Sequence, residues 1–149
     1  MKIVVDTNII FSALLNSDNT IGDLLFNPEM NFEFYSCDYM RYEIQKHWER
    51  LKKISKFSDK QLEISYSHIL SNLKFINEEI IPVETWLSAE MISKNIDIDD
   101  IDFVALTKFL KATLWTGDKV LYNGLKKLNF KKIINTTDLL ALRITKGKK

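Results

Sequence analysis

Carboxylate side chains follow two apolar runs of this sequence, each at the point where a buried strand would end. Asp6 comes directly after the run Ile3–Val5, and Asp118 comes two residues after a second run at 112–116. Ligands of open α/β sheets bind at the carboxyl ends of the strands. Neighbouring parallel strands lie ~4.8 Å apart, so the two carboxylates could share one cation. Taken singly, each Asp is equally compatible with a turn or with a helix cap.

A dense acidic cluster lies between these two residues. Asp97, Asp99, Asp100 and Asp102 precede the apolar segment 103–106, which is typical of a buried helix. Capping and the helix dipole explain one or two acids at a helix start. Four acids so close together repel one another, and a bound cation would relieve that repulsion. The residues alone leave metal binding and plain capping open.

A further acid lies on a predicted amphipathic helix. Apolar residues recur every three or four positions from Met40 to Leu51, and Glu43 falls on the shoulder of this stripe. An acid there can point along the boundary between core and solvent. The spacing alone favours the simpler interpretation, a surface glutamate that pairs with Lys46 or His47 one turn further on.

The elements that must position these acids alternate between strands and helices. Strands are expected at 2–6, 32–36, 79–83, 112–116 and 132–136. Helices are expected at 8–15, 20–27, 39–56, 59–76, 84–95, 100–111, 118–128 and 137–145. Ser58 or Asp59 is the expected cap of the helix that starts near 59. The alternation predicts an α/β fold with a central parallel sheet that helices cover on both faces.

Length and composition indicate one globular domain. With 149 residues, 46% of them hydrophobic, the chain can build one core, and we expect a single domain at 1–145 followed by a basic tail at 146–149. The single cysteine, Cys37, excludes a disulfide framework and a Cys-rich zinc site within the chain, and it fits a reducing compartment. No segment approaches the ~20 apolar residues of a membrane span, so we expect a cytoplasmic protein without membrane contact.

Charge is distributed unevenly along the chain, although its net value is only +1. Residues 77–102 hold eight acids and one lysine, whereas residues 124–149 hold eight bases and one acid. Such segregation is compatible with a metal centre flanked by a phosphate-binding surface. Solvated helix faces and a lysine-rich tail would produce the same pattern.

The order of these motifs resembles that of the PIN domain. The resemblance rests on Asp6-x-Asn8, Glu43, the segment 99–106 and Trp-Thr-Gly-Asp at 115–118, and it extends from residue 2 to about residue 140. PIN domains are nucleases, and the VapC-type toxins of toxin–antitoxin modules are a large group among them. The resemblance implies a three-layer α/β/α fold with a five-stranded parallel sheet and a metal-dependent endoribonuclease activity.

The resemblance also assigns roles to single residues. The catalytic and metal-binding acids would be Asp6, Glu43, Asp100 and Asp118. Asn8 and Thr116 would support them by hydrogen bonds. The third acid stays open: family spacing favours Asp100, whereas helical phase places Asp99 and Asp102 nearer the face of the buried helix.

Four carboxylates without cysteine or paired histidines form a hard oxygen site, which suits Mg²⁺ or Mn²⁺. Ions held there can activate water against a phosphodiester bond. RNA capture would fall to basic side chains near the acids, Arg41, Lys46, Arg50 and Lys119. The implied partners are an RNA substrate, a cognate antitoxin and a second copy in a homodimer. The alternatives are a catalytically silent PIN-like module that binds RNA or protein, and a housekeeping RNA-processing nuclease.

Overall fold

The structure, a computed structural model, describes residues 1–15, 20–26 and 31–147. At its centre lies a five-stranded sheet in the order β3-β2-β1-β4-β5, with every neighbouring pair parallel. Its strands are β1 (Lys2–Val5), β2 (Glu33–Cys37), β3 (Lys74–Ile76), β4 (Thr113–Trp115) and β5 (Ile133–Ile134). The α/β class and the parallel five-stranded sheet predicted from the sequence are confirmed.

Strand β1 occupies the middle of the sheet, and its side chains are fully buried from Ile3 to Val5. Both faces of a parallel sheet are covered, which is why this strand is a continuous apolar run. Val5 pairs in register with Trp115 of β4. The residues that follow β1 and β4 therefore emerge side by side at the same edge of the sheet.

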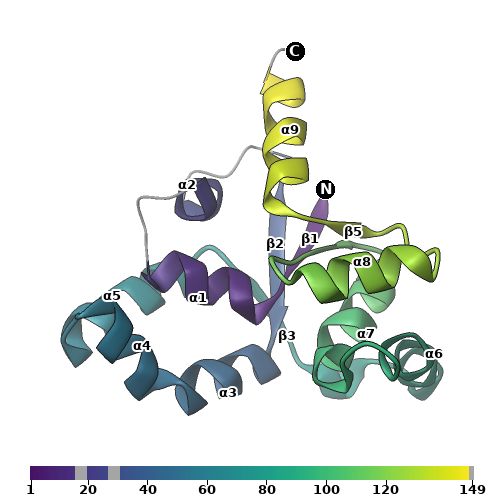
Figure 1. Cartoon of the computed structure of the whole chain (residues 1–149), viewed down its shortest axis with the longest axis horizontal. Coiled ribbons are helices and arrows are strands. Elements are labelled where there is room, and N and C mark those ends of the chain that lie inside the picture. Colours follow the sequence, from purple (N-terminus) through teal and green to yellow (C-terminus); the bar gives the residue numbers. More distant parts are fainter. Residues whose placement is uncertain (16–19, 27–30, 148–149) are drawn as a thin grey trace.

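Helices cover both faces of the sheet (Figure 1). Helices α1 to α5 lie on one side, where α9 packs against α2, and α6 to α8 lie on the other. Their bounds are α1 (Thr7–Leu15), α2 (Thr20–Phe26), α3 (Asp38–Lys46), α4 (Trp48–Ser55), α5 (Asp59–Leu70), α6 (Val83–Ser93), α7 (Ile101–Leu110), α8 (Lys119–Lys127) and α9 (Thr136–Gly147), with short 3₁₀ helices η1 (Glu78–Ile80) and η2 (Ile98–Asp100).

Most helices lie where the sequence predicted them, with changes at their ends. The helix predicted at 39–56 is divided at His47 into α3 and α4. The last residue of the helix predicted at 20–27 lies outside the described residues. Helix α9 extends to Gly147, so Lys146 belongs to this helix, whereas Lys148 and Lys149 lie outside the described residues. None of the helices in the described part of the chain is long and apolar enough to cross a membrane.

The position predicted for the third strand was wrong. The segment 79–83 was predicted as a strand, but it holds the end of η1 and the first residue of α6. Pro82 precedes α6 and has no N–H to donate to a strand ladder. The strand is instead β3, with Ile76 paired to Cys37 of β2.

The helix predicted at 59–76 also ends earlier than expected, because β3 takes its last residues. Helix α5 stops at Leu70. Ser71 Oγ and Asn72 Nδ2 both donate to the carbonyl oxygen of His68, at 2.6 and 3.3 Å. These side chains satisfy a carbonyl group near the helix end, so the chain can leave the helix and enter the strand.

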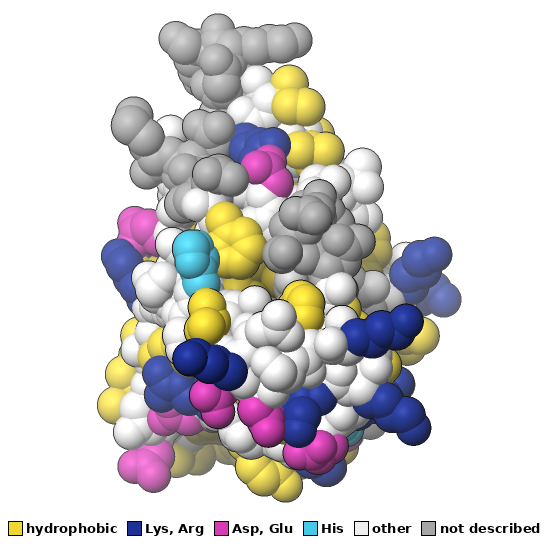
Figure 2. Space-filling view, turned by 90° about the vertical axis from the view of Figure 1, so that its left-hand side faces the viewer, with side chains coloured by type: hydrophobic (Ala, Val, Ile, Leu, Met, Phe, Trp, Pro, Cys, Tyr) yellow, Lys and Arg dark blue, Asp and Glu magenta, His cyan; other side chains and the backbone are white. Residues whose placement is uncertain are grey.

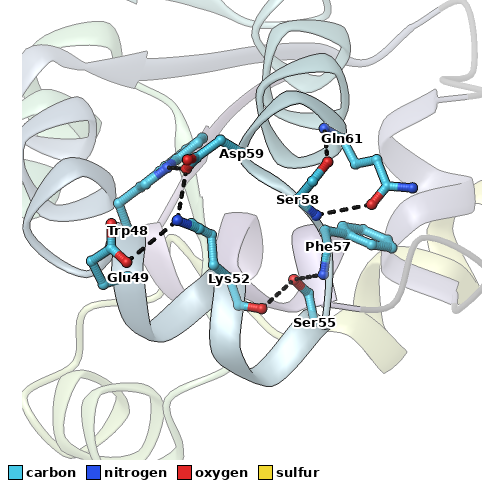
Figure 3. A network of polar contacts seen from close by, with 8 residues as sticks. All are labelled: Trp48, Glu49, Lys52, Ser55, Phe57, Ser58, Asp59 and Gln61. Atoms are coloured by element: carbon cyan, nitrogen blue, oxygen red, sulfur yellow. Dashed lines mark hydrogen bonds and ion pairs between the residues drawn. The ribbon is translucent and has the colours of Figure 1, made fainter.

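Figure 3 shows the corner between α4 and α5. Ser58 caps α5 with a reciprocal pair of bonds: Gln61 N donates to Ser58 Oγ at 3.2 Å, and Ser58 N donates to Gln61 Oε1 at 2.9 Å. Asp59 instead accepts hydrogen bonds from Trp48 Nε1 and Lys52 Nζ, both at 3.0 Å. Ser58 is thus the helix cap, one of the two residues predicted for that role, and Asp59 ties α5 back to α4.

Candidate active site

Asp6 lies at the carboxyl end of β1, where its side chain is only 4% exposed. Its backbone N–H donates to the carbonyl oxygen of Trp115 at 3.1 Å, which continues the β1–β4 ladder by one residue. Thr116 Oγ1 donates to Asp6 Oδ2 at 2.7 Å. Burial raises the pKa of Asp6 to about 6, against the opposing effect of the Thr116 bond, and the charges of Glu43 and Asp118 add to the rise.

Thr116 and Asn8 join the ends of β1 and β4 into one network. The Thr116 hydroxyl accepts from Asp118 N at 3.0 Å and from Asn8 Nδ2 at 3.4 Å. Asn8 Oδ1 in turn accepts from Gly117 N at 3.0 Å. Thr116 therefore contacts Asp6 and the backbone of Asp118 directly, whereas Asn8 contacts Thr116 and the backbone of Gly117.

Asp118 is both a helix cap and a neighbour of the acidic site. Its Oδ1 accepts from Val120 N at 2.9 Å and from Leu121 N at 3.3 Å, which caps α8. The capping interpretation is confirmed, and the charge of Asp118 also acts on Asp6 and Asp100. Because both capping bonds use Oδ1, they also fix how the carboxylate is oriented.

Glu43 makes a different contact from the one that the helical spacing favoured. Thr7 Oγ1 donates to Glu43 Oε1 at 2.6 Å, so α3 is linked to the residue next to Asp6. The side chain is half-buried, and its pKa is raised, mainly by burial and further by the charge of Asp99. Thr7 was not singled out in the sequence; its place directly after the strand-end acid is the signal that could have found it.

Asp100 lies close enough to the other three candidate acids, Asp6, Glu43 and Asp118, for their charges to act on it. It precedes α7 without making a capping bond, and its Oδ2 is buried with no hydrogen-bond partner in the described part of the chain. Burial raises the pKa of Asp100 to about 8, and the charges of Asp6, Asp97, Asp118 and Glu43 contribute. This buried oxygen without a partner is what a cation would compensate.

Asp99 is exposed, and its backbone N–H donates to Asp97 Oδ1 at 3.0 Å. Asp102 shares a hydrogen bond with Glu78, and burial together with this bond raises the pKa of Asp102 to about 7. Glu78 itself accepts from the backbone N–H of Asp38 at 2.8 Å and of Tyr39 at 3.1 Å, at the start of α3. Asp102 and Glu78 thus hold the helix that carries Glu43. Glu78 lies between the helix predicted at 59–76 and the strand predicted at 79–83, and no local signal in the sequence indicates this contact.

The four basic residues expected to bind RNA differ in their surroundings. Arg41 pairs with Asp38 at 3.2 Å and lies 3.8 Å from the centre of the Phe75 ring. Lys46, Arg50 and Lys119 are exposed and form no ion pair with the described part of the chain. Basic and acidic side chains are interspersed over the lower part of the side on which α4 and α5 lie, so the surface there is not uniformly positive (Figure 2).

The four candidate acids are chemically compatible with a hard cation, although their side chains do not surround a common point. Asp6, Glu43, Asp100 and Asp118 offer oxygen atoms only, the ligands that Mg²⁺ and Mn²⁺ prefer. Among the described residues, no three Asp, Glu, His or Cys side chains are arranged so that they could hold a metal ion as they stand. Two observations support a cation at these acids: the raised pKa values of Asp6 and Asp100, and the Asp100 oxygen that has no hydrogen-bond partner among the described residues.

The fold and the site define the class: an α/β protein with an acidic centre at the carboxyl edge of a parallel sheet. The family model described as PIN domain matches residues 4–141. The chain belongs to the PIN domain family, whose members are in general nucleases.

Two solved structures share this fold. VapBC2 from Rickettsia felis, determined with a DNA fragment from its promoter, aligns with a TM-score of 0.70 at 17% identity, over 91% of this chain and 98% of that chain. PAE2754 from Pyrobaculum aerophilum aligns with a TM-score of 0.67 at 14% identity, over 95% of this chain and 88% of that chain. A search of curated proteins found no match.

Proposed function

We propose that this protein is a metal-dependent endoribonuclease and the toxin component of a toxin–antitoxin module. The observation that carries the proposal is the convergence of four acids on one edge of the sheet: Asp6 and Asp118 from strand–helix junctions, Asp100 from the junction of η2 with α7, and Glu43 from α3. Burial, with the charges of neighbouring acids adding to it, raises the pKa values of Asp6, Glu43 and Asp100 and lowers stability, as expected of a site built for a ligand rather than for the fold.

Asp6, Asp100 and Asp118 are the acids that would hold Mg²⁺ or Mn²⁺, with Glu43 as a further ligand or as the residue that orients the attacking water. A bound ion would activate water and neutralise charge on the phosphodiester. The chain's own residues position these groups. Thr116 holds Asp6 in place, while Thr7 holds Glu43 beside it.

The substrate of the proposed reaction is RNA, and Lys46, Arg50 and Lys119 are the basic residues best placed to receive its phosphates. All three are exposed and free of ion pairs with the described residues. Arg41 is already held by Asp38 and Phe75, and would contribute less. Contacts of this kind give affinity that falls with salt and carry no sequence preference.

An antitoxin would act on the same acids. A cluster in which one buried carboxylate oxygen has no partner among the described residues accepts a basic side chain as readily as a cation, so a partner that inserts an Arg or Lys would block the site. The structural likeness to VapBC2 from Rickettsia felis supports a partner of this kind.

A homodimer is supported by an apolar stripe on α6. Val83, Leu87 and Met91 are spaced by four residues and are 72%, 56% and 71% exposed, while Ala89 on the opposite face is buried against the rest of the molecule. A contiguous exposed apolar stripe marks an interaction surface. Across a two-fold axis the same three residues would meet their own copies.

Cleavage of total RNA and of structured single-stranded RNA tests the proposal. We would compare the wild-type chain, Asp6→Asn, Asp118→Asn and the control Glu63→Gln in Mg²⁺, Mn²⁺ or EDTA. Asn is as good a helix cap as Asp, so Asp118→Asn keeps α8 intact. Glu63 is exposed on α5, and its substitution should change nothing.

We expect ion-dependent cutting by the wild type and the control, with products that carry a 5′-phosphate and a 3′-hydroxyl, and a loss of at least about 100-fold in both Asn variants. Undiminished cutting by Asp6→Asn would refute the proposal. Binding of RNA without any cutting, together with no Mn²⁺ binding, would favour the silent binding module instead.

A further inference from the structure

A polar hollow of about 410 Å³ lies directly beside the candidate active site. It shares Thr116, Gly117 and Asp118 with that site, and it extends over the first turns of α8 to the start of α9. The remaining lining residues are Lys119, Tyr122, Asn123, Asn135, Thr136 and Thr137. A strand whose phosphodiester reaches the acids would have to pass over this hollow or over the opposite side of the site.

The lining of the hollow is largely neutral. Its charged side chains are one acid, Asp118, and one base, Lys119, so it offers little net attraction for a phosphate group. Most of the other lining residues carry a hydroxyl or an amide group. Amide side chains both donate and accept hydrogen bonds, and hydroxyls do the same, which matches the mixed donor and acceptor edges of a nucleobase and the hydroxyls of a ribose.

Part of this lining is held rigidly. Tyr122 Oη donates to Asp138 Oδ2 at 2.9 Å, and Asp138 N donates to Asn135 Oδ1 at 2.8 Å. Lys126 Nζ lies 4.7 Å from the centre of the Tyr122 ring and restrains it further. The hollow therefore has a fixed aromatic wall, against which a base can pack.

Two side chains of the lining remain available for a ligand. Asn123 and Thr137 are exposed and make no side-chain hydrogen bond to any described residue. They lie on different helices, α8 and α9, and each is next in the sequence to one partner of the Tyr122–Asp138 contact. The volume of the hollow lies within the ~300–1,000 Å³ of ordinary ligand pockets.

We infer that this hollow holds the nucleoside of one nucleotide that flanks the cleaved phosphodiester, and that Asn123 and Thr137 read its base. The inference rests on the proposed ribonuclease function. It assigns sequence preference to the α8–α9 side of the site, separately from the acids that carry the chemistry. Lys119, at the rim, would contact the neighbouring phosphate.

Sequencing of the cut sites in a randomised single-stranded RNA pool tests the inference. The variants are Asn123→Ala and Thr137→Val. Their matched controls are Asn95→Ala and Thr20→Val, which replace exposed residues outside the hollow. All four positions are exposed, so the fold should be preserved in every variant.

We expect the wild type to prefer certain bases at one position beside the cut. This preference should fall at least about fivefold in Asn123→Ala and Thr137→Val, since one hydrogen bond is lost, while ion-dependent cutting persists. The controls should keep the wild-type preference. Cutting with the same base preference in all five proteins, or with no preference in the wild type, would overturn the inference and leave the proposed nuclease standing.

A second measurement covers the case in which the wild type cuts no RNA with either ion. Binding of a fluorescein-labelled random single-stranded RNA is then measured by anisotropy in EDTA. Weaker binding by Asn123→Ala than by Asn95→Ala would keep the nucleoside site although the proposed activity has failed. Equal binding by the two variants, or no binding by the wild type, would overturn the site as well.

Discussion

Asp6→Asn should make the ion-free protein more stable while it abolishes function. Asp6 is 4% exposed, and its pKa rises from the ordinary 3.8 to about 6, mainly through burial. Each pH unit of pKa change corresponds to about 1.4 kcal/mol, so the ionised side chain costs the folded state about 3 kcal/mol. Asn has nearly the same shape and can keep an oxygen on the Thr116 hydroxyl, but it bears no charge.

The sign of the effect follows from linkage. Because the folded-state pKa is the higher one, the folded state holds its proton longer than the unfolded state, and stability falls as pH rises from about 4 through about 6. Well below pH 3.8, Asp6 is neutral in both states, and wild type and variant should be equally stable. Above pH ~6.5 the variant should exceed the wild type by up to about 3 kcal/mol, or roughly 6–12 °C in Tm.

Urea and thermal unfolding in EDTA at pH 4.5, 6 and 8 measure this difference, with Glu63→Gln as the control for loss of an exposed acid. In excess Mn²⁺ the difference in stability between Asp6→Asn and the wild type should become smaller or change sign, because only the wild type would gain stability from the ion. An Asp6→Asn protein that is less stable than the wild type at pH 8 in EDTA would refute the reasoning. So would a stability difference that does not depend on pH.

Three further predictions concern the ion, the dimer and the helix cap. Mn²⁺ affinity should rise steeply between pH 6 and 8, because Asp6 and Asp100, with pKa values of about 6 and about 8, lose their protons in this range. Calorimetric titration at pH 5.5, 7 and 8.5 measures the affinity, and an affinity that does not change with pH would contradict the prediction. Leu87→Lys should convert the expected dimer to a monomer by light scattering with an unchanged circular dichroism spectrum, and an unaltered mass contradicts the α6 interface. Ser58→Ala should lower stability by about 1 kcal/mol through loss of the α5 cap, without affecting RNA cleavage, as chemical denaturation beside the cleavage assay would show.

The sequence predicted the elements whose signals are local. The apolar run before Asp6 indicated a buried parallel strand, and β1 is indeed fully buried at the centre of the sheet. Ser58 and Asp59, both residue types that cap helices, predicted the start of α5, and Ser58 forms the cap. Such signals depend on a side chain and its neighbours within one turn or one strand, so they can be read without knowledge of the fold.

Local signals were insufficient where two segments competed for the same place in the sheet. Lys74–Ile76 forms β3 although the segment 79–83 is more apolar, because pairing with β2 and the proline at 82 decide which of the two can join the ladder. The same limit applies to Glu43. Its place on the shoulder of a helix suggested a surface pair, yet its bond goes to Thr7, 36 residues away.

The sequence shows which residues of the candidate site are acidic or polar and where they lie along the chain, and the family resemblance groups them. It does not show which of these side chains contact one another. Thr116 bonds Asp6 across 110 positions because β1 and β4 are neighbours in the sheet, and that order is a property of the whole chain. Likewise, Asp99, Asp100 and Asp102 are the same residue type in different surroundings. Asp100 has a buried oxygen without a partner among the described residues, Asp99 is exposed, and Asp102 is bonded to Glu78. Periodicity specifies which way a side chain leaves its own element, whereas burial and the charges that act on it depend on how the other elements pack against it.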